Sequence, residues 1–221
     1  MLHSLEDLHD SLASAPERVQ IRASLEEALQ LALTPISCLR EEGFKCLANL
    51  LAEASSEPSA LNAICNALQN VVDPVLGAIL KSLDAWSPAQ QRAIGACVHE
   101  VSLREFEASV LALQGLALLY PPFRDAARVR GVMEVLLHKL DLDHRATKRL
   151  CIRGLDALVV DSMPNILRMT EVSGIEKVCS VLRDPRLPTS LRACCAELLS
   201  LITAELRQAH ITAPAPGVRN Q

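Results

Sequence analysis

Residues 129–135, VRGVMEV, return 43 residues later as VSGIEKV at residues 172–178. The matched positions are Val129, Gly131, Val132 and Val135 with Val172, Gly174, Ile175 and Val178. A period of this length is typical of armadillo and HEAT repeats, whose units contain two or three helices. Because one such unit cannot bury its own apolar face, we expect neighbouring units to stack around a continuous core.

The same spacing continues on both sides of this stretch. At a spacing of 43 residues, Cys151, Leu155 and Leu158 match Cys194, Leu198 and Leu201. At a spacing of 42 residues, Val110, Leu113, Leu116 and Pro122 match Ile152, Leu155, Leu158 and Pro164. Chance coincidence among leucines is the alternative explanation, and the matched Gly and Pro residues argue against it. We expect Gly131 and Gly174 in the turn before the middle helix of each unit.

Composition agrees with an all-α, armadillo/HEAT-like helical repeat stack. The 221 residues include 38 Leu and 29 Ala but only five aromatic residues, and Leu and Ala favour helices over sheets. We expect one helical domain over residues 1–210, followed by a flexible, proline-containing tail over residues 211–221. The expected helices cover 2–14, 16–33, stretches opened by Pro35, Pro58, Pro74 and Pro88, then 103–119, 129–141, 143–161, 164–171, 173–183 and 189–209.

Charge and cysteine usage favour a reduced compartment and protein partners. The net charge is −4, so a general affinity for nucleic acid is not expected. Residues 108–123, the longest uncharged run, are too short to span a membrane, so we expect a buried helix there. The eight cysteines fall in apolar helical patterns, without any Cys-x-x-Cys pair or a signal peptide, and reduced thiols in the cytoplasm are the better interpretation.

Motifs for catalysis, cofactors or metals are missing from the sequence. It contains no glycine-rich phosphate loop, no Gly-x-Ser-x-Gly and no Cys-x5-Arg, so we expect neither an enzyme nor a cofactor. His138, His144 and Cys151 could converge on a metal, but two surface histidines and a core thiol are the favoured interpretation. The pairs Glu26-Glu27 and Glu41-Glu42 fit solvated helix faces, and Cys194-Cys195 fits core packing rather than redox chemistry.

One basic pattern suggests a binding surface. Arg145, Arg149 and Arg153 recur every four residues, so they form a row along one side of the helix expected at 143–161, with leucines on other sides. Guanidinium groups at this spacing could hold an acidic peptide through paired hydrogen bonds. An ordinary charged surface is an equally good explanation.

Three stretches resemble the fungal cell division control protein fourteen family, a component of the septation initiation network unrelated to the phosphatase of similar name. LQGLALLYPPFR (113–124) is similar to a family motif of a Gly-Leu helix, His-Pro-Pro and Ser-Arg, with Tyr120 and Phe123 replacing His and Ser. VMEVLLHKLD (132–141) and DALVVDSMPNILRMTEVSGIEKVCSVLRD (156–184) resemble the stretches that follow. The resemblance covers residues 108–203, and the family's aromatic-rich last helix is replaced here by AELLSLI.

The resemblance implies a non-catalytic, armadillo-like partner of a germinal-centre (Ste20-like) protein kinase, acting in septation and cytokinesis at the spindle pole body. An unrelated adaptor that binds an acidic peptide through the arginine row is the alternative, and an enzyme with an unfamiliar helical site is a third. We expect no metal, no nucleic acid and no membrane, and leave homo-oligomers open. The residues expected to contact the partner are Gln114, Pro121, Pro122, Arg124, Arg145, Arg149, Arg153, Asn165 and Arg168.

Overall fold

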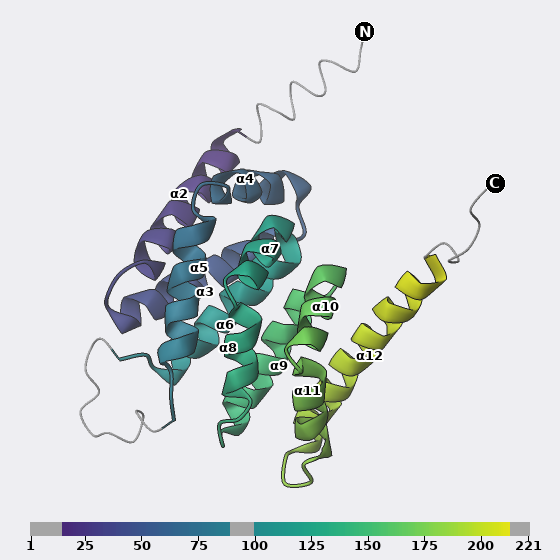
Figure 1. Ribbon diagram of the computed structural model, residues 1–221. Helices are drawn as coiled ribbons and strands as arrows, with labels where there is room; N and C mark the ends of the chain where they lie inside the picture. Colours follow the sequence, from purple (N-terminus) through teal and green to yellow (C-terminus); the bar gives the residue numbers. More distant parts are fainter. Residues whose placement is uncertain (1–14, 89–99, 213–221) are drawn as a thin grey trace, which may run out of the picture. The chain divides into compact units, whose positions relative to one another are not determined.

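The protein is all-α in the part that the computed structural model describes, residues 15–88 and 100–212 (Figure 1). The predicted helix at 2–14, most of the helix opened by Pro88, and tail residues 213–221 lie outside these ranges. The fold class predicted from the sequence, an all-α helical repeat stack, is confirmed. The helices in the described ranges are α2 (Ala15–Ala32), α3 (Ser37–Ala54), α4 (Pro58–Leu68), α5 (Val72–Ala85), α6 (Leu103–Leu119), α7 (Pro121–Val129), α8 (Val132–Lys139), α9 (Arg145–Val159), α10 (Met163–Glu171), α11 (Gly174–Arg183) and α12 (Thr189–Thr212).

Proline marks the start of several helices, but the prediction failed at one pair of prolines. Proline lies in the first turn of α4, α7 and α10, where its missing N–H removes no helical hydrogen bond. The predicted gap between helices at 103–119 and 129–141 is wrong, because Pro121 and Pro122 begin a helix there. The chain instead begins α7 at once and breaks at Arg130 and Gly131 before α8. The uncharged run 108–123 is therefore divided between two helices.

The repeat is visible as two consecutive trios of helices, α7–α8–α9 and α10–α11–α12. Each trio begins with a nine-residue helix. A turn with a positive-φ residue follows, Gly131 at +76° in the first trio and Ser173 at +56° in the second. The positive-φ positions are thus 42 residues apart. Gly131 lies in the predicted turn, whereas Gly174, which we predicted in the turn, is the first residue of α11, and Ser173 occupies the turn position one residue before it.

The register of the last helix differs by one residue from the sequence match. Cys151 in α9 and Cys195 in α12 are both fully buried, while Cys194 is only partly buried. The equivalent cysteines are therefore 44 residues apart, not 43. The reason is that α11 spans ten residues where α8 spans eight, so the second trio contains extra chain before its last helix.

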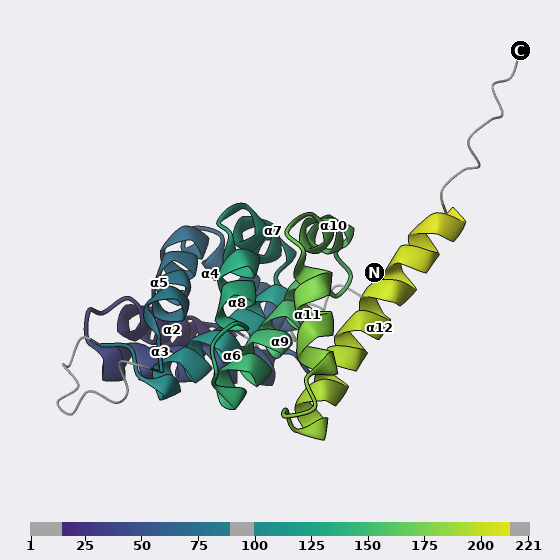
Figure 2. The same cartoon turned by 60° about the horizontal axis from the view of Figure 1, so that its bottom comes forward.

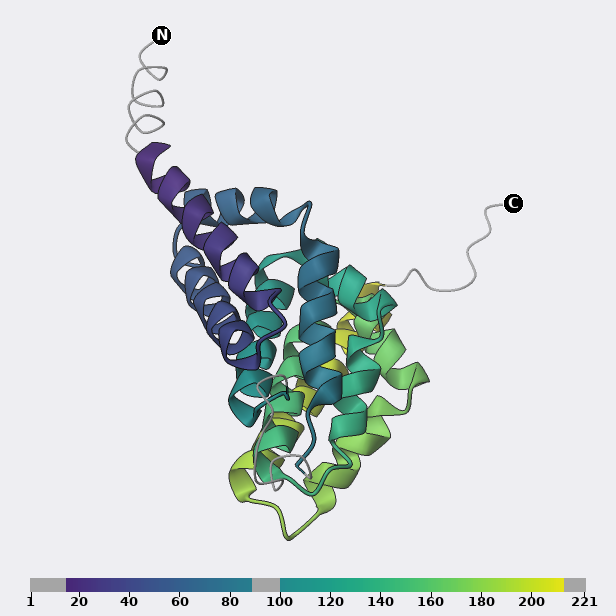
Figure 3. The same ribbon diagram turned by 90° about the vertical axis from the view of Figure 1, so that its left-hand side faces the viewer.

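The helices form two compact units that divide between Val135 and Leu136, inside α8. In the first unit, α3 packs against both α2 and α6, and α5 packs against α6 and α7. Figure 3 shows α2 (purple) and α3 (blue) side by side. Gly43 of α3 allows this close approach, since a Cβ there would meet backbone atoms of Ala28 and Ala32.

The second unit is organised around α12. This helix packs against α9, α10 and α11, and Figure 2 shows α11 and α12 lying beside each other. Its core includes Leu155, Leu158, Leu191, Leu198 and Ile202, all fully or almost fully buried. In the described part of the chain, no single helix meets the length and hydropathy needed to cross a membrane, whereas the bent α4–α5 pair meets them by length and composition alone.

Candidate functional site

The arginine row lies on the exposed side of α9. His144 caps this helix, accepting a hydrogen bond from the backbone N–H of Thr147 at 3.3 Å. Arg145, Arg149 and Arg153 are all exposed, while the other sides of the helix bury residues such as Leu150 and Leu155. The local sequence therefore presents three guanidinium groups to solvent, one helical turn apart.

Two of the three arginines have no partner within the described ranges. Neither Arg149 nor Arg153 takes part in an ion pair or hydrogen bond there, and Arg145 donates only a long hydrogen bond, 3.4 Å, to the carbonyl of Arg186. Some charged side chains elsewhere pair within one turn of their helix, as Arg22 does with Glu26 at 3.0 Å and Arg168 with Glu171 at 3.1 Å, whereas other exposed arginines such as Arg104 and Arg183 show no such pair among the described residues. The row on α9 therefore keeps its hydrogen-bond donors available for an external acidic group.

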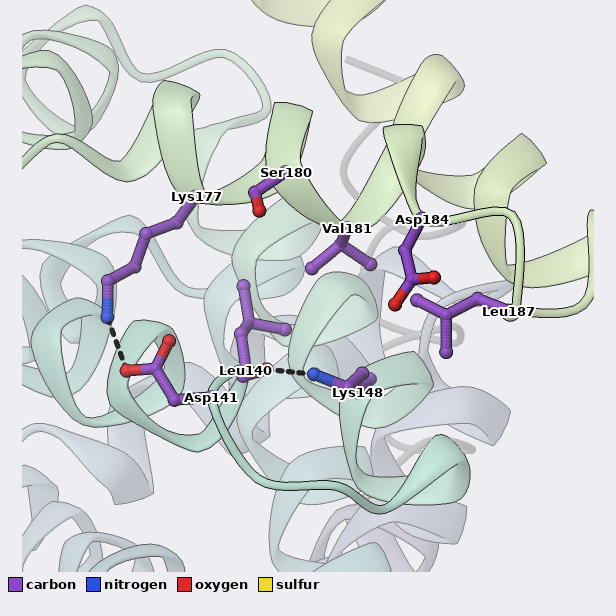
Figure 4. A pocket seen from close by; sticks show the side chains of 8 residues that line it. All are labelled: Leu140, Asp141, Lys148, Lys177, Ser180, Val181, Asp184 and Leu187. Atoms are coloured by element: carbon purple, nitrogen blue, oxygen red, sulfur yellow. Dashed lines mark hydrogen bonds and ion pairs between the residues drawn. The ribbon is translucent and has the colours of Figure 1, made fainter.

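Figure 4 shows a polar cavity of about 190 Å³ in the same unit. Lys177 of α11 pairs with Asp141 at 2.7 Å and lies 3.4 Å from the carbonyl of Leu137, while Lys148 of α9 donates to the carbonyl of Leu140. These carbonyls lie at the C-terminal end of α8, where cationic side chains offset the negative end of the helix dipole. The two lysines therefore have a clear structural role.

The opposite wall of this cavity is also internally paired. Asp184 accepts hydrogen bonds from the backbone N–H and Nε of Arg186, at 2.9 and 3.0 Å, and these bonds lower the pKa of its carboxyl group. Ser180, Val181 and Leu187 complete the lining. Since most of its charged groups already have partners, the cavity is a weaker candidate for ligand binding than the row on α9.

The remaining predicted contact residues are scattered over other elements. Pro121 and Pro122 are exposed at the start of α7, whereas Gln114 on α6 and Arg124 on α7 are half-buried. Arg168 on α10 is half-buried and bonded to Glu171. Among the predicted contact residues, only Arg145, Arg149 and Arg153 form a row of exposed charged side chains on one helix.

Asn165 does not lie on the surface. It is fully buried at the start of α10, where its Nδ2 donates a 2.6 Å hydrogen bond to the carbonyl of Leu158 at the end of α9. Its Oδ1 accepts no hydrogen bond from the described residues. This residue joins two helices, so the expectation that it contacts a partner is inconsistent with its burial.

The other chemical candidates are structural in this fold. His144 is a helix cap, His138 is exposed near Asp141, and Cys151 is fully buried. Across residues 15–88 and 100–212, no three His, Cys, Asp or Glu side chains are close enough to hold a metal ion. Burial raises the pKa of the Cys151 thiol to about 12 and that of Cys195 to about 11, so neither provides a thiolate at neutral pH.

The sequence analysis missed a buried charged cluster in the first unit. Arg40 of α3 and Glu105 of α6 form an ion pair at 2.6 Å, and both side chains are almost completely buried. Ser37 and Ser82 donate further hydrogen bonds to the Glu105 carboxylate, at 2.5 and 2.6 Å. The spacing Ser102-x-x-Glu105 resembles a helix capping box, and Ser102 does accept from the Glu105 N–H, but the carboxylate turns inward to α3 and α5.

Comparison with known proteins shows the fold only. No family model matches the chain, and no curated protein matches it. Among solved structures, the crystal structure of an engineered protein from the Northeast Structural Genomics Consortium is similar, with a TM-score of 0.57 and 17% sequence identity. The similarity covers 81% of this chain but only 62% of the engineered protein, so this chain corresponds to part of that protein's length.

Proposed function

We propose that this protein is a non-catalytic adaptor that holds an acidic segment of a protein partner against α9. The observation that carries the proposal is the unpaired row of Arg149 and Arg153, with Arg145 one turn before them. A guanidinium group is always charged and can bind a carboxylate through two parallel hydrogen bonds, so a row of them favours acidic ligands.

The structural roles of the other polar residues support an adaptor rather than an enzyme. An enzyme needs titratable groups grouped in a pocket with room for a substrate. In the described residues, Arg40 and Glu105 satisfy each other inside the core, and Lys177 and Asp141 do so at the cavity. The buried thiols have raised pKa values and are poor nucleophiles.

The resemblance of residues 108–203 to the septation family supports a narrower form of the proposal. In this form the partner is a germinal-centre-type kinase, bound outside its catalytic domain, and the complex acts in cytokinesis at the spindle pole body. The family's armadillo-like fold agrees with the helical repeat described above. The family motif around Pro121, Pro122 and Arg124 lies at the start of α7.

Co-expression with the germinal-centre-type kinase of the same organism tests both forms. We expect the full chain and the kinase to elute together in size-exclusion chromatography, and R149E/R153E to separate them. The matched control is R183E/R207E, which reverses two exposed arginines away from the row on α11 and α12. Both arginine pairs change the net charge equally, so only position differs.

The outcomes separate the two forms of the proposal. If kinase and chain elute separately at micromolar concentration, the kinase proposal is wrong. If they elute together and R149E/R153E behaves as R183E/R207E does, the kinase is a partner but the arginine row does not bind it.

A further inference from the structure

The arginine row ends at a pair of carboxylates. Asp156 follows Arg153 by three residues on α9, and Glu197 lies on the neighbouring α12. Both side chains are exposed on these two packed helices, and partial burial, with the charge of Glu197 as a smaller cause, raises the pKa of the Asp156 carboxyl group. The charge of the exposed side chains along α9 thus changes from positive to negative within one helical turn.

This carboxylate pair is also unneutralised. Arg153 and Asp156 have the i, i+3 spacing at which Asp125 and Arg128, or Arg168 and Glu171, form ion pairs. In the described ranges no ion pair or hydrogen bond of a side chain involves Asp156 or Glu197. The surface therefore presents three guanidinium groups followed by two carboxylates, without internal compensation.

We propose that the segment bound on α9 is a bipolar helix: it places an acidic residue at every fourth position opposite Arg145, Arg149 and Arg153, and a Lys or Arg one turn later opposite Asp156 and Glu197. This inference rests on the proposed function and specifies the chemistry of the partner.

Spacing favours a helix over an extended chain. Arginines four residues apart on α9 are separated by about 6 Å along the helix axis, and acidic residues four apart on a partner helix have the same separation. Alternate residues of an extended chain are about 6.7 Å apart, so the mismatch with the arginine spacing increases along the row. The exposed residues of the same two helices include the small side chains of Ala146, Ala193 and Ala196.

The carboxylate pair also argues against nucleic acid as the ligand. A phosphate backbone carries negative charge at every position, so it would meet repulsion where it passes Asp156 and Glu197. A protein helix can instead carry acidic side chains opposite the arginines and a basic side chain opposite Asp156 and Glu197.

NMR titration of the full chain with three alanine-based peptides tests the inference. The first peptide carries Glu at every fourth position over three turns and Lys one turn later, the second replaces that Lys by Glu, and the third scrambles the order of the first. At an ionic strength of about 0.01 M, where surface charges are weakly screened, amide shifts should map to α9 and α12. We expect the first peptide to bind about threefold more tightly than the other two, the range of an exposed ion pair.

Variants of the carboxylates provide the matched comparison. D156N/E197Q should abolish the preference for the first peptide over the second, while E176Q, an exposed position on α11, should retain it. Equal binding of the first two peptides would overturn the bipolar partner but leave the proposed function standing, provided R149E/R153E still abolishes the shifts. Equal binding of the scrambled peptide would overturn the helical ligand. A DNA duplex titrated under the same conditions is the last comparison. If it binds more tightly than the first peptide, or if no peptide shifts any amide signal, the inference and the proposed function are both overturned.

Discussion

Helices α6 and α9 are equivalent elements that use charge in opposite ways. They begin 42 residues apart, each capped by a side chain, Ser102 in α6 and His144 in α9. The third residue after each cap is fully buried, Glu105 in one and Thr147 in the other. Glu105 is neutralised by Arg40 from α3, whereas the Thr147 hydroxyl lies 2.8 Å from Nδ1 of its own cap, His144.

The exposed sides of the two helices differ as much. Glu107 and Leu111 on α6 correspond, 42 residues on, to Arg149 and Arg153 on α9, and all four are exposed. The repeat therefore preserves where a residue lies but not what it does. The charge of Glu105 in α6 is enclosed and paired with Arg40, while the charges of Arg149 and Arg153 in α9 remain available to a partner.

Removing the enclosed charge should have the largest effect. Arg40→Met leaves Glu105 buried without its cation, and breaking a buried pair in this way costs about 3–5 kcal/mol. The free energy of unfolding from urea denaturation measures it. R40M/E105M should recover most of the loss, because it removes both charges; a double variant as unstable as the single one would show that the pair is not the cause.

The close approach of α2 and α3 should be the next most sensitive feature. Gly43→Ala places a Cβ against backbone of α2, which cannot yield as a side chain can, and overpacking of this kind costs about 1–3 kcal/mol. Gly77→Ala is the control, since its nearest neighbour is Nη2 of Arg130 at 3.8 Å. Equal thermal stability of the two variants would contradict the described packing.

The join between α9 and α10 should be less costly to break. Asn165→Ala removes the hydrogen bond to the Leu158 carbonyl and leaves that buried acceptor unpaired, a loss of about 1–3 kcal/mol. Binding to the partner should change only as far as the fold does, because Asn165 is fully buried. A variant with native stability and lost binding would place Asn165 at the interface after all.

The smallest effect concerns the pH dependence of stability. The pKa of Asp156 is raised in the folded state, so its ionisation opposes folding: the penalty is present above the folded pKa and disappears as pH falls below the ordinary value near 3.8. Asp156→Asn should therefore be slightly more stable than the native chain at pH 7 and lose this advantage in acid. Urea unfolding across pH measures the difference. An Asp156→Asn variant that is less stable than the native chain at pH 7 would show that the pKa of Asp156 is not raised by folding.

The repeat and most helix positions could be predicted from the sequence because leucine periodicity and proline placement act locally. The start of α7 was missed because Pro121 and Pro122 can either stop a helix or begin one, and only the packing of Phe123 and Ala127 decides. The one-residue shift of the cysteine match arises from the length of α11, which the leucine pattern does not encode.

The candidate site was predicted in part for the same reason. A row of arginines at helical spacing depends on one helix, so its exposure follows once α9 is placed. The Arg40–Glu105 pair joins residues 65 positions apart, and nothing near either residue distinguishes it from a solvated charge. Asn165 resembled a surface residue because its role depends on the end of the preceding helix.

A reciprocal charge swap tests the central claim, that α9 holds an acidic segment of a partner, most directly. R149E/R153E should weaken binding of the co-purified partner by about tenfold, as expected for two exposed ion pairs turned into repulsions. Changing the partner's facing acidic residues to Lys, once cross-linking has located them, should restore most of that affinity to R149E/R153E and weaken binding to the native chain. The claim would be contradicted if R149E/R153E left the affinity unchanged, or if no charge swap in the partner restored the lost affinity.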